Sequence, residues 1–142
     1  MQELPLVYFL CTGNACRSQM AEGWASALFG DRLQAKSAGV EPTALDPRAT
    51  AAMAEAGVDI SAQVAKAIDP LTLHQAALVI TLCDDADQRC PLTPPEVRRL
   101  HWPLPDPASA EGGGGEALEA FRQVRDELKR KILTLPQLLE LP

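Results

Sequence analysis

A cysteine followed five residues later by an arginine, within residues 11–18, is the segment of this chain best suited to chemistry. The segment reads Cys-Thr-Gly-Asn-Ala-Cys-Arg-Ser. A thiolate is a good nucleophile. The planar guanidinium of Arg17 matches two oxygens of a tetrahedral oxyanion, which the point charge of a lysine cannot imitate. The spacing therefore predicts an anion site with a nucleophile, Cys11, at its floor, although a chance spacing in a structural turn is the alternative.

The main chain of the same segment can also bind an anion. The segment lies between an apolar run typical of a buried strand and a stretch of helical composition, so its N–H groups and the positive helix end can converge on one point. Gly13 allows backbone angles closed to most residues, and Asn14 tolerates them. Ser18 can donate to the Cys11 thiolate. We expect the anion to be bound by Thr12, Gly13, Asn14, Ala15, Cys16, Arg17 and Ser18.

Cys83 and Cys90 form a second group of candidate residues, and Cys83 directly follows another apolar run. The chain's four cysteines indicate reactive thiols or a metal site more than structural disulfides, if the protein is intracellular. The C-x4-C and C-x6-C spacings lack the close pairs of structural zinc sites, so we expect no metal. Inert buried thiols remain an alternative for Cys83 and Cys90. Cys16 is best interpreted as a small wall residue of the anion site.

The composition is that of one soluble globular domain spanning residues 1–142. The chain has a mass of 15.3 kDa and is 46% apolar and 23% charged, which is ordinary for such a domain. With 13 basic and 19 acidic residues its net charge is −6, opposite to the balance of a nucleic-acid binder. No apolar run approaches the roughly 20 residues of a membrane span, and the start does not resemble a leader. We expect a cytoplasmic protein without nucleic-acid or membrane partners.

The elements that must position these residues alternate between strands and helices, which predicts an α/β fold with a parallel sheet covered on both faces. Expected strands cover residues 6–10, 33–37, 77–82 and 97–102, and expected helices cover 18–29, 46–55, 68–75 and 118–132. In the flavodoxin-like strand order 2-1-3-4, the first and third strands are neighbours, and ligands bind beyond their carboxyl ends. Cys11 and Cys83 follow those two ends.

The segment CTGNACRSQMAEG at residues 11–23 resembles the phosphate-binding loop of the low-molecular-weight tyrosine phosphatase fold. It is most similar to the loop of the thioredoxin-coupled arsenate reductases that share this fold. The resemblance continues at SAG (37–39), TLCDDADQRCP (81–91), HWPLPDP (101–107) and FRQVRDELK (121–129), and so covers nearly the whole chain. It implies the four-stranded fold described above and the reduction of arsenate to arsenite. It also implies thioredoxin as the reductant, without an organic cofactor.

The resemblance also assigns roles to residues. Cys11 would attack arsenate held by the loop amides and Arg17, while Asp106 would protonate the departing oxygen. Cys83 would then attack Cys11 to release arsenite, and Cys90 would attack Cys83, leaving a Cys83–Cys90 disulfide for thioredoxin. From the residues alone, the Asp-Pro pair at 106–107 is simply a turn, so the role of Asp106 depends on the resemblance.

The two disulfides make different demands on the fold. Neighbouring parallel strands lie about 4.8 Å apart, which suits a Cys11–Cys83 bridge with its Cα separation of roughly 4.4–6.8 Å. If residues 84–89 are helical, however, the seven-residue step from Cys83 to Cys90 rises about 10.5 Å. We therefore expect oxidation to unwind this segment and to expose the new disulfide to its reductant.

In some reductases of the family a potassium ion lies behind the loop. The resemblance matches Asn14, Glu22 and Ser37 to three of its ligands, but Lys66 stands where the family carries a fourth, acidic ligand. An ammonium group cannot ligate a cation, although it can replace one by pairing with Glu22. We therefore expect no potassium site, and an activity that is indifferent to potassium against sodium.

Two other functions stay open. One is a phosphomonoesterase that uses Cys11, Arg17 and Asp106 through a phosphocysteine and accepts phosphate or aryl phosphates. Phosphatases of this fold place an aromatic residue after Asp-Pro, whereas Ala108 follows it here, which indicates a small inorganic anion. The other is a non-enzymatic sensor of oxyanions or redox state that binds a partner when it is oxidised.

Overall fold

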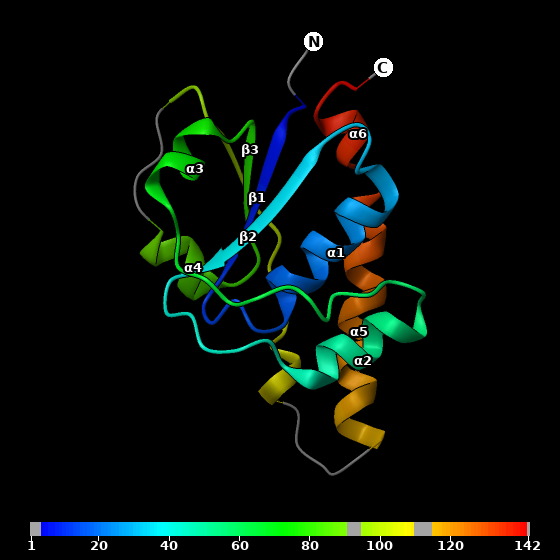
Figure 1. The fold of residues 1–142 in the computed structure, drawn as a ribbon. Coiled ribbons are helices and arrows are strands. Elements are labelled where there is room, and N and C mark those ends of the chain that lie inside the picture. The colour runs from blue at the N-terminus through cyan, green and yellow to red at the C-terminus, as the bar shows by residue number, and fades with distance from the viewer. Residues whose placement is uncertain (1–3, 91–94, 110–114, 142) are drawn as a thin grey trace.

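The computed structural model describes residues 4–90, 95–109 and 115–141, and a four-stranded parallel sheet lies at its centre (Figure 1). Its strands are β1 (Leu6–Cys11), β2 (Gln34–Gly39), β3 (Leu78–Thr81) and β4 (Arg98–His101). They are arranged in the order β2-β1-β3-β4, and every neighbouring pair is parallel. The predicted fold class and strand order are therefore confirmed.

The two central strands are apolar because helices cover both of their faces. Every residue of β1 and β3 is buried, which is the pattern of strands in a parallel sheet packed on both sides. β4, at the edge, reads Arg-Arg-Leu-His and is only partly buried. In the pairing of β1 with β3, Leu10 lies level with Thr81, so the chain segments that carry Cys11 and Cys83 leave the sheet side by side.

Helices α1 (Arg17–Phe29), α2 (Pro47–Glu55) and α5 (Gly115–Ile132) lie on one side of the sheet, and α3 (Pro70–Gln75) and α4 (Asp84–Arg89) lie on the other (Figure 1). The chain also forms a 3-10 turn at Pro107–Ser109 and a short helix, α6 (Leu135–Leu138). The apolar stripe of α5, which includes Phe121, Val124, Leu128 and Ile132, is buried. This confirms the helical spacing predicted near the C-terminus.

Helix starts follow ordinary capping chemistry. Asp46 Oδ1 accepts a hydrogen bond of 2.9 Å from the Arg48 N–H, which caps α2 as the Asp-Pro sequence predicts. Asp69 caps α3 in the same way, with 3.0 Å to the Leu71 N–H. The expected start of that helix at residue 68 was therefore too early, because Asp69-Pro70 is itself the cap and first-turn signal.

The remaining differences lie at element ends. The expected strands at 77–82 and 97–102 are each one residue shorter at both ends, α1 begins one residue early, and α5 begins at residue 115 instead of 118. The 3-10 turn and α6 were not predicted. β2 covers residues 34–39 instead of 33–37 because its pairing with β1 continues to Cys11 and Gly39. A Cβ at Gly39 would come within 2.7 Å of the Asn14 nitrogen and the Thr12 oxygen, so glycine permits this close approach.

Candidate active site

Residues 11–18 connect the end of β1 to the start of α1. Cys11 is the last residue of β1 and is 2% exposed. Its Sγ lies 2.8 Å from Ser18 Oγ, in the first turn of α1. The sheet and the helix therefore fix the nucleophile candidate and its hydroxyl neighbour from opposite ends of the loop.

The carbonyl groups of this loop are engaged on its outer side. Those of Cys11, Thr12, Gly13 and Ala15 accept hydrogen bonds of 2.8–3.2 Å from backbone N–H groups in the segment 40–46. The N–H groups of residues 12–16 have no acceptor within the described part of the chain. Because buried N–H groups are normally paired, this row of free donors is suited to an anion, together with the helix N-terminus that follows.

A cavity of about 240 Å³ lies over the loop. Seven of the predicted binding and catalytic residues line it, together with Thr43 and Ala108. The lining residues are Cys11, Thr12, Gly13, Ala15, Cys16, Arg17, Thr43, Asp106 and Ala108. The small side chain of Ala108 forms part of the cavity wall, and the preference for a small inorganic anion that it indicates stays a prediction. Sequence reasoning missed Thr43, whose N–H binds the Gly13 carbonyl at 3.0 Å. It comes from a segment with no local signal of its own.

Asn14 and Ser18, also expected to bind the anion, do not line this cavity. Both side chains are fully buried, and Asn14 Nδ2 donates to Ser18 Oγ at 2.7 Å. The left-handed backbone falls on Asn14, with φ of 50°, and not on Gly13, where it was also expected. At Gly13 a Cβ would lie 3.0 Å from Thr43 Oγ1, so a close approach of chain segments favours glycine there.

Arg17 joins the loop to the segment that carries Asp106. Its Nη1 donates to the Leu104 carbonyl at 3.0 Å. Its Nε is buried and has no acceptor among the described residues. A buried charged donor without a partner is costly, and an anion oxygen in the adjoining cavity would supply the acceptor.

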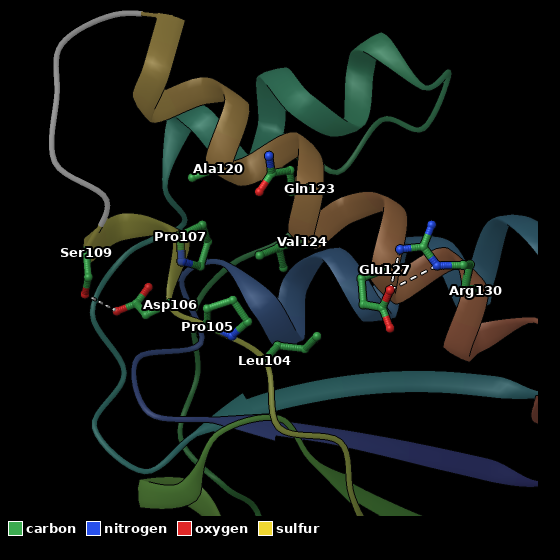
Figure 2. A pocket seen from close by; sticks show the side chains of 10 residues that line it. All are labelled: Leu104, Pro105, Asp106, Pro107, Ser109, Ala120, Gln123, Val124, Glu127 and Arg130. Atoms are coloured by element: carbon green, nitrogen blue, oxygen red, sulfur yellow. Dashed lines mark hydrogen bonds and ion pairs between the residues drawn. The ribbon is translucent and has the colours of Figure 1, made fainter.

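Asp106 follows β4 and lies beside the 3-10 turn. Its Oδ1 accepts from the Ala108 N–H at 3.0 Å, and its Oδ2 accepts from the Ser109 hydroxyl at 3.2 Å. Asp106 also lines a second, larger cavity of about 780 Å³. Figure 2 shows the residues around this cavity, which lies between the Asp106 loop and α5. Asp106 thus stands between the two cavities, at the wall of the smaller one.

Thr12 links the loop to Cys83. Its Oγ1 lies 3.3 Å from Cys83 Sγ and donates to Asp85 Oδ2 at 2.8 Å. Cys83 caps α4, where its Sγ accepts from the Ala86 N–H at 3.4 Å. The second thiol therefore contacts Thr12, which follows the nucleophile candidate in sequence, and it does not line the cavity. Sequence reasoning missed the contact to Asp85, because it arises only when α4 folds.

Cys90 lies at the other end of α4 and is buried. All four cysteines are free thiols. Residues 84–89 are helical, which was the condition for the predicted unwinding, and this helix separates Cys83 from Cys90. Burial raises the pKa of the Cys90 thiol, with Arg99 opposing the effect. The thiol is therefore a poor nucleophile while the helix is folded, and the unwinding of α4 stays a prediction.

Cys16 lies in the wall of the cavity. Its Sγ contacts Asp46 Oδ2 at 3.9 Å. Burial, reinforced by the Asp46 carboxylate, raises the pKa of the Cys16 thiol to about 12. It therefore remains protonated at neutral pH, which agrees with a wall residue.

Polar side chains fasten α4 to the sheet. His101 Nε2 lies 2.8 Å from Asp84 Oδ1, and Asp87 Oδ1 accepts from the Thr81 hydroxyl at 3.1 Å. Arg99 pairs with Asp87 at 3.4 Å. Helix α4 is therefore held against the sheet mainly by individual polar contacts, and Ala86 is the residue that it buries.

The potassium ligands that the resemblance offers do not fit a cation here. Lys66 Nζ lies 3.7 Å from Glu22 Oε1 and 3.5 Å from Ser37 Oγ, so an ammonium group contacts two of the three side chains. Within residues 4–90, 95–109 and 115–141, no cluster of three or more His, Cys, Asp or Glu side chains could hold a metal ion. None of the helices in those ranges is both long and apolar enough to cross a membrane.

Comparison with known proteins points to one family. Residues 6–140 match the family described as low molecular weight phosphotyrosine protein phosphatase. An arsenate reductase of Bacillus licheniformis is 56% identical over 126 residues, which is 89% of this chain and 91% of that protein.

Solved structures agree with this. An arsenate reductase in the phosphate-binding state is similar, with a TM-score of 0.79 and 34% identity, over 96% of this chain and 99% of that one. A thioredoxin-dependent arsenate reductase of Corynebacterium glutamicum also gives a TM-score of 0.79, with 27% identity, over 99% of this chain and 64% of that one.

Proposed function

The chain belongs to the low molecular weight phosphotyrosine protein phosphatase family, and on that premise we propose that it is an arsenate reductase that takes its electrons from thioredoxin. Its likeness to arsenate reductases along most of its length supports this. The observation that carries the proposal is the 3.3 Å contact between Thr12 Oγ1 and Cys83 Sγ. A phosphatase needs one thiol at the anion loop, whereas a reductase needs a second thiol within reach.

The first step uses the anion loop. Arsenate binds to the free N–H groups of residues 12–16 and to Arg17. The Cys11 thiolate forms a sulfur–arsenic bond while one oxygen leaves as water after protonation, with Asp106 as the donor. Ser18 Oγ, 2.8 Å from the sulfur, stabilises the thiolate before the attack.

Reduction happens in the second step. The Cys83 thiolate attacks Cys11 Sγ, so that a sulfur–sulfur bond forms and the sulfur–arsenic bond breaks. The electron pair of the broken bond stays on arsenic, which leaves as arsenite in the +3 state. The two thiols have together lost two electrons, which equals the number that arsenic has gained. Thr12 lies between the two cysteines, because it follows Cys11 in sequence and its hydroxyl contacts Cys83 Sγ.

The third step returns Cys11 to its thiol form. Cys90 attacks Cys83, the Cys11–Cys83 bond breaks, and a Cys83–Cys90 disulfide remains. This step requires α4 to unwind, because its helical rise keeps the two cysteines apart. The dithiol of thioredoxin then reduces the disulfide and is itself oxidised. A cytoplasmic location suits this chemistry, because reduced thioredoxin and free thiols are maintained there.

A coupled assay tests the proposal. With arsenate, thioredoxin, thioredoxin reductase and NADPH, we expect steady NADPH oxidation that depends on arsenate. Cys90→Ser should abolish turnover after one equivalent of arsenite, while hydrolysis of an aryl phosphate continues at the unmodified rate. If the unmodified protein showed no NADPH oxidation but hydrolysed aryl phosphates well, the phosphomonoesterase alternative would replace the proposal. Binding of a partner without turnover of either substrate would favour a sensor.

A further inference from the structure

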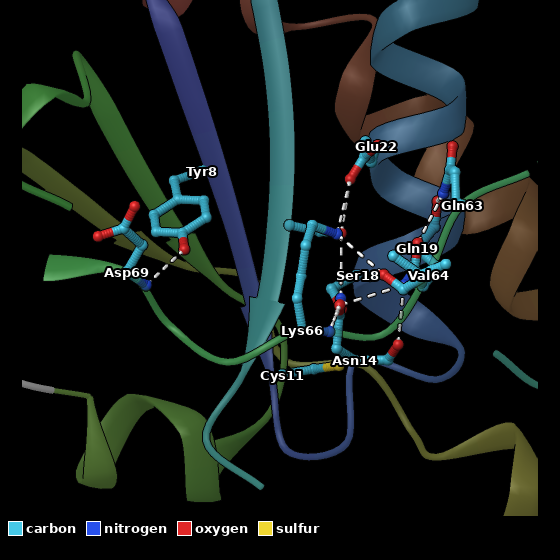
Figure 3. A network of polar contacts seen from close by, with 11 residues as sticks. Tyr8, Cys11, Asn14, Ser18, Gln19, Glu22, Gln63, Val64, Lys66 and Asp69 are labelled. Carbon is cyan, nitrogen blue, oxygen red and sulfur yellow. Dashed lines mark hydrogen bonds and ion pairs between the residues drawn. The ribbon is translucent and has the colours of Figure 1, made fainter. Parts of the chain in front are cut away.

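A chain of buried polar side chains runs from Cys11 to the back of the loop (Figure 3). Cys11 Sγ lies 2.8 Å from Ser18 Oγ. Asn14 Nδ2 donates to Ser18 Oγ at 2.7 Å and to Ser37 Oγ at 3.0 Å. Asn14, Ser18 and Ser37 are fully buried. No solvent contact competes with these hydrogen bonds, so their directions are fixed by their partners.

The far end of the chain is an ion pair. The Ser37 hydroxyl donates to Glu22 Oε1 at 2.7 Å. Lys66 Nζ lies 3.7 Å from the same carboxylate oxygen, and it donates to Ser37 Oγ at 3.5 Å and to the Val64 carbonyl at 3.1 Å. The Glu22 side chain is 17% exposed and that of Lys66 is 42% exposed. The Lys66 ammonium therefore lies at the solvent-exposed end of this network of buried hydrogen bonds.

Counting donors and acceptors gives this chain one direction. Asn14 Oδ1 accepts from the Lys66 N–H at 3.0 Å and from Gln19 Nε2 at 3.1 Å, which fixes the orientation of the Asn14 amide. Both protons of its Nδ2 are then used on Ser18 and Ser37. Because Ser18 Oγ accepts one of these protons, its own proton remains available for Cys11. Ser37 Oγ accepts the other and gives its only proton to Glu22.

Glu22 holds the far end of this network, because its carboxylate accepts the Ser37 proton and keeps Ser37 Oγ placed to accept from the Asn14 amide. A mostly buried carboxylate is stable only when a positive charge or hydrogen bonds compensate it. Lys66 supplies the charge, and its contact with Ser37 also holds that hydroxyl in the accepting orientation. Loss of the ammonium would therefore loosen the Glu22–Ser37 end of the network, which helps to hold the Asn14 amide and, through it, the Ser18 hydroxyl beside the Cys11 sulfur.

We infer that Lys66 is a positioning residue for Cys11: its ammonium group is a built-in cation that holds Glu22 and so fixes the side chains that place the Ser18 hydroxyl against the Cys11 sulfur. It acts where the resemblance implies a potassium ion, and it makes such an ion unnecessary. The inference requires only that Cys11 reacts as a thiolate. It therefore stands or falls separately from the reduction of arsenate and from thioredoxin.

The test measures the reactivity of Cys11 without any oxyanion substrate. The rate of its alkylation by iodoacetamide at pH 7 is followed by mass spectrometry, which distinguishes the four cysteines, and the melting temperature is measured in parallel. Lys66→Met, which keeps the length and removes the charge, should slow alkylation about tenfold, as expected for weakening a hydrogen bond to a charged group. Lys66→Arg should restore the rate to within about twofold, because the charge returns. Lys36→Met is the matched control, since Lys36 is an exposed residue beside Ser37 in β2, and it should leave the rate unchanged.

A second arm compares potassium with sodium at equal ionic strength, using the unmodified protein. The alkylation rate and melting temperature should be the same in both salts. An unchanged rate in a folded Lys66→Met variant would overturn the inference, and so would a rise of more than twofold in potassium. If Lys66→Met did not fold, Lys66→Arg and the salt comparison would still decide, because a slow Lys66→Arg variant with a native melting temperature contradicts a role for the charge.

Discussion

At the scale of single residues, the guanidinium of Arg17 explains how an acidic protein can hold an anion. Its Nη1 is bound to the Leu104 carbonyl, while its buried Nε has no acceptor among the described residues. The free N–H groups of residues 12–16 lie beside it. The site thus uses local donors against the net charge of −6, and short-range hydrogen bonds dominate because salt screens the distant charges.

Arg17→Lys should weaken the binding of inorganic phosphate by about 10–100-fold, the range for lost hydrogen bonds to a charged group. A lysine keeps the charge but cannot bind Leu104 and the anion with one planar fork. Isothermal titration calorimetry measures the effect. Arg130→Lys serves as the control, because Arg130 is exposed and pairs with Glu127 on α5. Equal phosphate affinity in Arg17→Lys and the unmodified protein would contradict the assignment of Arg17 to the anion.

The raised pKa of Cys16 leads to a second prediction at this scale. Because its pKa is about 12, the thiolate fraction of Cys16 rises about tenfold for each pH unit between 7 and 10, without a plateau. Its alkylation rate in the folded protein, measured by mass spectrometry, should follow that slope. In denaturant the same residue should level off near its ordinary pKa, which provides the control. A plateau below pH 9 in the folded state would show that burial does not govern this thiol.

At the scale of elements, the sequence predicts those parts of the fold that depend on local signals. The all-apolar β1, the Asp-Pro cap of α2 and the helical spacing of α5 follow from burial and capping rules, and the structure confirms them. Element ends differ by a few residues because pairing and packing decide them. The extension of β2 to Gly39, for example, follows from its register with Cys11.

The sequence could not predict the contacts that join elements around the candidate site. Thr12 meets Asp85 only because β1 and β3 are neighbours and α4 folds beyond them. The left-handed backbone could fall on either Gly13 or Asn14, and it falls on Asn14, while the Thr43 side chain approaches Gly13 closely. Such contacts are tertiary, so no local pattern carries them.

Helix α4 supports a prediction about redox potential, which rests on the proposed relay. Gln88 is an exposed residue within this helix. Gln88→Gly should destabilise the helix by about 0.5–1 kcal/mol. Since the disulfide form lacks the helix under the proposal, the change penalises only the dithiol form. The reduction potential of the Cys83–Cys90 pair should become more negative by roughly 10–20 mV.

Redox titration against a dithiol buffer of known potential measures this shift. Gln88→Ala, which favours the helix slightly, should move the potential in the opposite direction or leave it in place. An unchanged or more positive potential for Gln88→Gly would mean that the helix persists in the disulfide form, and the proposed unwinding would be wrong.

At the scale of the whole molecule, two layers of helices hold the sheet that presents the site. On one side, α2 contacts α5 through Glu55, which accepts from Arg122 at 2.8 and 2.9 Å and from Arg125 at 3.2 Å. Arg125 also donates to the Ala52 carbonyl, and its own carbonyl accepts from Trp24 of α1. Three helices thus meet at one cluster of charges, on the opposite side of the sheet from α4 (Figure 1).

This cluster predicts how stability changes in acid. The hydrogen bonds of Arg122, with Arg125 assisting, lower the pKa of Glu55 to about 2, against about 4.3 in an unfolded chain. A lowered carboxyl pKa stabilises the folded state above the unfolded value, and this contribution is lost as the pH falls from about 4.3 toward 2. Glu55→Gln should therefore lower the melting temperature at pH 7. The difference from the unmodified protein should shrink steadily between pH 5 and pH 2.

Thermal melts across this pH range measure the difference. They are made at low salt, because Glu55 is exposed to solvent and screening weakens such pairs. Glu96→Gln, at an exposed position before β4, is the control and should show no such convergence. If the Glu55→Gln difference stayed constant down to pH 2, the carboxylate would not be the group that joins α2 to α5.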